Sequence, residues 1–233
     1  MKLPPKWPNY VSNPAFSREY LIKMYVRLAT WGIFTSLWVY EILILSGSNS
    51  ALYYIWKFST LNWFAVNLTI VYLTLDILNS ELSLRIPERI LSYLYLLSVS
   101  SNAMVIIGYW SLYIIEPEMM TRLTNPVSVY SFLVTLFFHG GNLALVLANS
   151  FSFPKFFPFA FKHLAILEVF CFLAYFAMIS ICKTMTGRSV YGFMDEVDSV
   201  VLGIFYSALY VIGLMVKLTV SRLIQAKNKV KGL

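Results

Sequence analysis

Charged side chains are scarce in this sequence: only 12% of its 233 residues carry a charge, whereas 59% are hydrophobic. An average soluble domain has about twice that charged fraction, so the composition argues against a soluble protein. Histidine and cysteine are also scarce, with two residues of each. The usual zinc sites need more ligands than this, and neither a metal nor another cofactor is expected. Cys171 and Cys182 lie about 16 Å apart along one predicted helix, which is too far for a disulfide.

Long apolar runs make up most of the remaining sequence. Stretches of about 20 apolar residues, the length of a helix that crosses a bilayer, recur along the whole chain. The sequence therefore predicts an all-α polytopic membrane protein with about six transmembrane helices. Its single membrane domain covers residues 28–220, between basic tails at residues 1–27 and 221–233. The predicted spans are Leu28–Gly47, Phe58–Leu78, Ile90–Ile115, Val127–Asn149, Leu164–Cys182 and Val200–Val220.

The 18 Lys and Arg residues are distributed unevenly. Most fall in the two tails and in loops on the same side of the predicted bundle. Arg27 and Lys217 are counted with the tails. Cytosolic segments of membrane proteins are rich in Lys and Arg, so both termini are expected to be cytosolic. The net charge of +7 then reflects orientation at an anionic leaflet and indicates no nucleic-acid partner. The cations on the other side are Lys57, Arg122, Lys183 and Arg188.

The carboxyl-terminal tail carries a candidate targeting signal. Lys231 and Lys229 are the third and fifth residues from the end. This spacing resembles the dilysine signal that returns membrane proteins to the endoplasmic reticulum through coatomer. It predicts an endoplasmic-reticulum membrane protein with coatomer as a partner, and a generic basic tail is the alternative.

His139 lies inside the apolar run Val127–Ala148, where no water is available to its imidazole. It therefore needs a hydrogen-bond partner or a chemical role, and a plain bond to a neighbouring helix is the alternative to catalysis. Asn142 lies on the same helix face, three residues later. Gly140 and Gly141 lower the bulk between them, so that another backbone or a substrate can approach.

A threonine hydroxyl such as that of Thr60 needs a base before it can act as a nucleophile, and His139 is the only deeply placed histidine. Threonine in a membrane helix more often bonds to a carbonyl one turn earlier, so Thr60 alone does not indicate catalysis. The acidic residues near helix ends, Asp76 and Glu168, are expected to be structural. Glu168 is expected to pair with Lys162 or another neighbour.

Four stretches, in the same order along a six-helix chain, resemble the androgen-induced-gene family of membrane hydrolases. Trp56–Leu61 resembles the segment that carries the family's nucleophile, and His139-Gly140 resembles its catalytic histidine segment. Trp110–Met120 is similar to the end of the third helix and the loop after it. Thr186–Phe193 is similar to the loop before the last helix. The similarity extends over about residues 50–220.

The resemblance implies an intramembrane hydrolase that cleaves fatty acid esters of hydroxy fatty acids or related lipids. Carried over to this chain, it makes Thr60 the nucleophile and His139 the general base. Familiar animal members have an asparagine before the histidine and a second histidine three residues after it, where this chain has Phe138 and Asn142. Asn142 is a candidate to orient the ring or to bind an oxyanion. Asn62 follows Thr60 by two residues, where animal members have an acid or amide at three, and no third triad member is identifiable.

Two other functions stay open at this point. The chain could be a non-enzymatic membrane protein of the endoplasmic reticulum that binds a lipid or a partner, or an acyltransferase in which an alcohol replaces water. Depth sets a further condition, because His139 lies about 18 Å from the predicted lumenal end of its helix, whereas Thr60 is near the start of its own. The two side chains meet if the second helix begins nearer Tyr53 or if the fourth helix is tilted.

Overall fold

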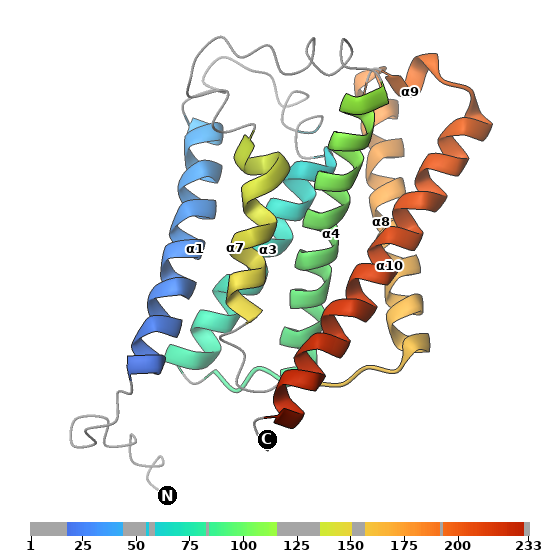
Figure 1. The fold of residues 1–233 in the computed structure, drawn as a ribbon. Coiled ribbons are helices and arrows are strands. Elements are labelled where there is room, and N and C mark those ends of the chain that lie inside the picture. Colours follow the sequence, from blue (N-terminus) through green and yellow to red (C-terminus); the bar gives the residue numbers. More distant parts are fainter. Residues whose placement is uncertain are drawn as a thin grey trace, which may run out of the picture.

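The computed structural model describes residues 18–43, 55, 59–82, 84–115, 136–150, 157–191 and 193–230, and Figure 1 shows their arrangement. Every regular element within these ranges is a helix, which confirms the all-α prediction. The elements are α1 (Arg18–Leu43), α3 (Leu61–Glu81), α4 (Glu88–Ile115), η1 (Phe137–Gly141), α7 (Asn142–Ser150), α8 (Phe161–Thr186), α9 (Phe193–Glu196) and α10 (Ser199–Val230).

The long helices form a bundle around α4. This helix contacts α3 on one side, α10 on another, and η1 and α7 on a third, while α1 packs on α3 and α7. The first residues of α1 and the last residues of α10 lie at the same end of the bundle, and α9 lies at the opposite end (Figure 1). This second end is called the α9 end below. It is the end at which α3 begins and α4 finishes.

Four of the described helices are long and apolar enough to cross a bilayer: α3, α4, α8 and α10. They confirm a multi-pass membrane protein. The count of six spans and the cytosolic placement of both termini stay predictions. Residues 1–17 and 116–135, with the first half of the Trp56–Leu61 stretch, lie outside the described residues. Lys231 also lies outside them, and only the backbone of Lys229 is described.

The outer helices are longer than the predicted spans, and this corrects the assignment of two cations to the tails. α1 begins at Arg18 rather than Leu28, and α10 continues to Val230 rather than ending at Val220. Arg27 therefore lies within a helix, as does Lys217, which was counted with the tail although it falls inside the predicted span Val200–Val220. Both are buried, with 7% and 1% of their surface exposed.

Each of these buried cations is paired with an acidic residue on a neighbouring helix. Arg27 Nε lies 3.0 Å from Asp76 Oδ2 of α3. The ammonium of Lys217 forms an ion pair with Glu168 of α8, so Lys217 is the neighbour that pairs with this carboxylate. A charge at this depth is tolerated when it is paired. The two pairs therefore link α1 to α3 and α10 to α8.

The packing of α3 on α4 depends on small polar residues. Ser98 and Asn102 of α4 are buried where the two helices meet, as is Thr69 of α3. Small side chains let helices approach closely in a membrane, and their hydroxyls bond to carbonyls or to each other. Thr69 Oγ1 and Ser98 Oγ are 2.6 Å apart across this interface. The close contact holds the first turn of α3, and the site described next, against α4.

Candidate functional site

Thr60 is the residue at which α3 begins. Its backbone is extended (φ −71°, ψ 148°) and its Oγ1 accepts a long hydrogen bond from the backbone N–H of Trp63 at 3.5 Å. This is the standard arrangement of a threonine that caps a helix, and it explains why α3 starts at Leu61. Oγ1 is the acceptor in this bond, so the bond does not use the hydroxyl proton of Thr60. The positive end of the helix dipole also favours negative charge on this oxygen.

His139 lies at a kink in η1, the short element that leads into α7. Residues 137–141 form one π-helical turn, within which His139 has non-helical backbone angles (φ −106°, ψ 15°). Such turns free backbone groups from the helical pattern and are common at functional sites. The carbonyl oxygen of His139 accepts a hydrogen bond from the indole Nε1 of Trp110 at 2.7 Å. The indole thus satisfies a carbonyl that would be costly to leave unpaired in a membrane.

The imidazole ring of His139 is held on two sides. It stacks on the ring of Tyr109, with centroids 3.6 Å apart and planes 25° from parallel. Its Nε2 lies 2.9 Å from the amide Nδ2 of Asn62, in the first turn of α3. The ring is only 8% exposed. The structure therefore brings His139 to the first turn of α3, directly after Thr60. An earlier start of this helix, nearer Tyr53, is not what brings them together, because α3 begins at Leu61.

Asn142, the third predicted site residue, is directed elsewhere. Its Nδ2 donates to Asn102 Oδ1 of α4 at 2.6 Å, and its Oδ1 accepts from the backbone N–H of Leu143. Asn102 in turn donates to Thr69 Oγ1 of α3 at 2.9 Å. Asn142 is fully buried in this network. In this arrangement it ties α7 to α4 and α3, while Asn62 is the amide that reaches the imidazole.

A loop from the other half of the chain closes over the start of α3. The backbone N–H of Leu61 donates to the phenol oxygen of Tyr191 at 2.8 Å. Burial raises the pKa of this phenol, so it stays neutral. Tyr191 lies in the stretch that joins α8 to α9. Residues far apart in the sequence, from α3, α4, η1 and this stretch, thus meet at the α9 end of the bundle (Figure 1).

The same loop is held in shape by Asp195 of α9. Its carboxylate accepts hydrogen bonds from Lys183 Nζ at 2.8 Å, from Ser189 Oγ at 2.7 Å and from the backbone N–H of Ser189 at 3.2 Å. The hydrogen bonds from Lys183 and Ser189 lower the pKa of Asp195 to about 2. At the start of the loop Gly187 takes a left-handed conformation (φ 70°), which ends α8. These contacts position Tyr191 over Leu61.

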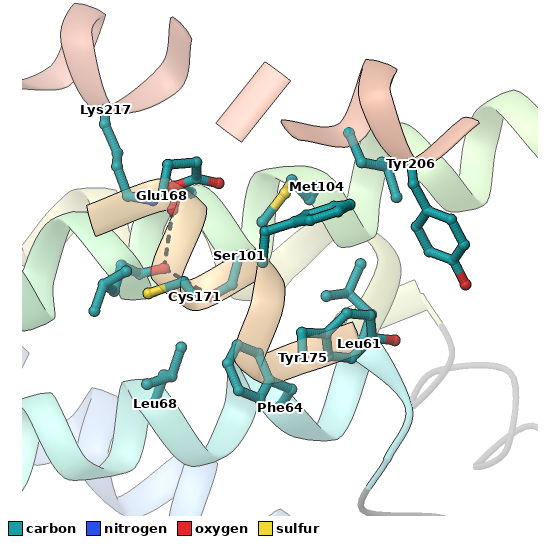
Figure 2. Close-up of a pocket in the computed structure, with 14 residues that line it drawn as sticks. Leu61, Phe64, Leu68, Ser101, Met104, Glu168, Cys171, Tyr175, Tyr206 and Lys217 are labelled. Carbon is teal, nitrogen blue, oxygen red and sulfur yellow. Dashed lines mark hydrogen bonds and ion pairs between the residues drawn. The ribbon is translucent and has the colours of Figure 1, made fainter. Parts of the chain in front are cut away.

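A partly open cavity begins beside this site. It lies between α3, α4, α8 and α10, and Leu61, the residue after Thr60, lines one end. Figure 2 shows Leu61, Tyr175 and Tyr206 at one side of the cavity, with Glu168 and Lys217 at the other. This cavity could not be predicted from the sequence, because its lining comes from four helices.

Two contributors to the site escaped the sequence analysis. Asn62 was noted after Thr60 but had no assigned role, and Tyr191 entered only as part of a motif. The amide two residues after a candidate nucleophile is the signal that could have identified Asn62. Tyr191 could not be identified from the sequence, because its partner is the backbone N–H of Leu61, which is 130 residues away in the chain.

The fold and these residues define a polytopic all-α membrane protein, with a buried histidine held against a helix that a threonine caps. The chain belongs to the FAR-17a/AIG1-like family, whose family model matches residues 22–225. The resemblance to the androgen-induced-gene family is thereby confirmed. No curated protein and no solved structure matches the chain.

Proposed function

We propose that this protein is an intramembrane lipid ester hydrolase in which Thr60 is the nucleophile and His139 the general base. The observation that carries the proposal is the contact between His139 Nε2 and Asn62 at 2.9 Å, in the first turn of the helix that Thr60 caps. A base and a hydroxyl at one helix start are what nucleophilic catalysis by threonine requires. The family's known substrates, fatty acid esters of hydroxy fatty acids, suit a site surrounded by apolar helices.

The first half of the reaction transfers the acyl group to the enzyme. Thr60 Oγ1 attacks the ester carbonyl carbon while His139 takes the hydroxyl proton. The tetrahedral intermediate collapses, the bond to the alkoxy oxygen breaks, and His139 gives its proton to that oxygen. The hydroxy fatty acid leaves and Thr60 carries the acyl group as an ester.

The second half returns the enzyme to its starting state. A water molecule gives a proton to His139 and its oxygen attacks the acyl-threonine carbonyl. Collapse of this second intermediate returns the proton to Thr60 and releases the fatty acid. The negative charge that develops in both steps lies at the N-terminus of α3, where the helix dipole favours it.

In this mechanism Asn62 positions the imidazole. The terminal amide of asparagine offers either its NH₂ or its carbonyl at the same place after a half-turn. With the carbonyl toward the ring, Asn62 accepts a hydrogen bond from Nε2–H, so that Nδ1 is the unprotonated nitrogen and takes the Thr60 proton. Stacking on Tyr109 limits rotation of the ring in either state.

The endoplasmic-reticulum membrane, with coatomer bound to Lys229 and Lys231, is the location we propose from the tail sequence.

Fluorophosphonate labelling of the purified full chain tests the proposal. Labelling of the wild type is expected to disappear in Thr60→Ala and to fall strongly in His139→Ala. Thr184→Ala, an exposed threonine on α8, is the matched control and should label like the wild type. Hydrolysis of a fatty acid ester of a hydroxy fatty acid should follow the same order. Labelling and turnover that persist in Thr60→Ala would show that the nucleophile is another residue.

A further inference from the structure

We propose that the cavity between α3, α4, α8 and α10 is the binding site for one linear acyl chain of the ester cleaved at Thr60. The inference rests on the proposed function and adds to it the place of the substrate chain and the limit on its length. The cavity begins at Leu61, which directly follows the nucleophile. A chain attached to a carbonyl at Thr60 would therefore start next to the mainly apolar lining of this cavity.

The lining of the cavity extends along the bundle, in the direction that an extended chain would take. Its lining on α10 runs from Tyr206 near the site to Lys217, which is about 16 Å along the helix axis. Its lining on α8 runs from Tyr175 to Glu168, about 10 Å along that helix. The lining residues therefore extend along the bundle, away from the α9 end.

The walls of the cavity favour hydrocarbon over a polar ligand. They are built mainly from Leu, Phe, Met, Cys and Tyr side chains. The serine hydroxyls on α4 are already committed: Ser100 Oγ donates to the carbonyl of Leu97 at 3.1 Å, and Ser101 Oγ donates to the same oxygen at 2.8 Å. The polar lining near the middle of the cavity thus offers no serine donor to a ligand. Apolar pockets with few polar groups are typical sites for lipid chains.

The ion pair of Glu168 with Lys217 forms the floor of the cavity. Both side chains are almost completely buried. Gly213 of α10 makes room for the carboxylate of Glu168, because a Cβ at residue 213 would clash with Glu168 Oε1. The two side chains of this buried ion pair cannot move apart to admit a longer acyl chain without exposing a charge to hydrocarbon. The pair therefore stops the chain end and sets the longest acyl group that fits.

Substitution of Cys171, which lines the cavity next to its floor, tests this reading. Cys171→Trp fills the inner part of the cavity, and Leu173→Trp puts the same bulk on the same helix at a position that is 57% exposed. The probes are p-nitrophenyl butyrate and p-nitrophenyl palmitate, hydrolysed by the full chain in detergent. We expect the palmitate-to-butyrate ratio of kcat/KM to fall at least tenfold in Cys171→Trp and to match the wild type in Leu173→Trp. An unchanged ratio in an active Cys171→Trp protein would overturn the inference.

A binding measurement that needs no turnover separates this inference from the proposed hydrolase. Thr60→Ala protein is photolysed with a diazirine-bearing palmitate, and the labelled peptides are identified by mass spectrometry. Labels are expected on the α4 and α8 segments that line the cavity, with at least a fivefold loss when Cys171→Trp is added and no loss with Leu173→Trp. Labels confined to the outer surface, or none, would refute the chain site even if hydrolysis is found. Labelling in the cavity without any hydrolysis would keep the chain site and refute the hydrolase.

Discussion

Replacing Lys217 by methionine is expected to destabilise the protein strongly. The change keeps the length of the side chain but removes the ammonium that pairs with Glu168. Only 1% of the Lys217 side chain and 2% of the Glu168 side chain is exposed, so neither water nor a lipid headgroup can replace the lost partner. Breaking a buried ion pair from one side typically costs about 3–5 kcal/mol, because the remaining charge is left without a partner. Glu168→Gln should cost a similar amount for the same reason.

The double variant Glu168→Gln/Lys217→Met carries the decisive information. With both charges removed, no uncompensated charge is buried, and its stability should return to within ~1–2 kcal/mol of the wild type. The two single changes are therefore strongly non-additive. Lys183→Met is the matched control. Lys183 pairs with Asp195 at 2.8 Å, but these side chains are 59% and 43% exposed, and an exposed pair contributes only ~0–1 kcal/mol.

Free energies of unfolding, measured by steric trapping in bicelles, distinguish these cases. The expected order places the double variant and Lys183→Met near the wild type, with both single variants well below them. If Lys217→Met costs no more than Lys183→Met, the buried pair does not exist as described, and the floor of the cavity loses its physical basis. Purely additive single and double variants would lead to the same conclusion.

Three further predictions concern the histidine, a close helix contact and the loop over the site. Asn62→Asp should keep most of the activity, because a carboxylate can still accept from His139 Nε2–H, whereas Asn62→Leu should lower kcat about 10–100-fold with little change in KM; equal kcat values would refute a positioning role. Gly213→Ala should cost ~1–3 kcal/mol of stability through the clash with the glutamate of the ion pair; Gly203→Ala, with nothing within 4 Å, should be neutral or slightly stabilising. Asp195→Asn should leave the pH profile of hydrolysis unchanged from about pH 5 to about pH 8, because a carboxyl with a pKa of about 2 is ionised over that whole range. Because its pKa is depressed from the usual ~3.9, the Asp195 carboxylate stabilises the loop above pH ~3.9, and this stabilisation is lost only as the pH falls through the lower pKa. A difference between the pH profiles of the wild type and Asp195→Asn near neutral pH would contradict the lowered pKa of Asp195.

The class of the protein was predictable from local features of the chain. Apolar stretches of about 20 residues need no tertiary information to be identified, because each helix satisfies its own backbone in the membrane. The helical elements therefore followed from the sequence, with errors at their ends. Arg27 and Lys217 show why the ends were uncertain: a charge usually marks the limit of a span, but a partner on a neighbouring helix lets the helix continue past it.

The candidate site was predictable in part. Thr60 and His139 stood out through the resemblance, and their roles stay predictions, but the sequence could not say how they meet. Their approach depends on a π-turn at His139, whose carbonyl is satisfied by Trp110. Asn142 looked like the natural partner of the ring because it lies on the same helix face. In the structure the Asn142 amide instead donates to Asn102 Oδ1 of the facing helix α4, at 2.6 Å.

The sequence by itself determined that this chain is an α-helical membrane protein of one family, with one deeply placed histidine and a threonine at a helix start. These properties depend on composition and on residues close together in the chain. Only the tertiary structure decided that Asn62 meets His139, that Tyr191 closes over Leu61, and that a cavity runs to an ion pair of Glu168 with Lys217. Each of these contacts joins different helices, and which faces meet depends on side-chain packing and on the pairing of buried charges.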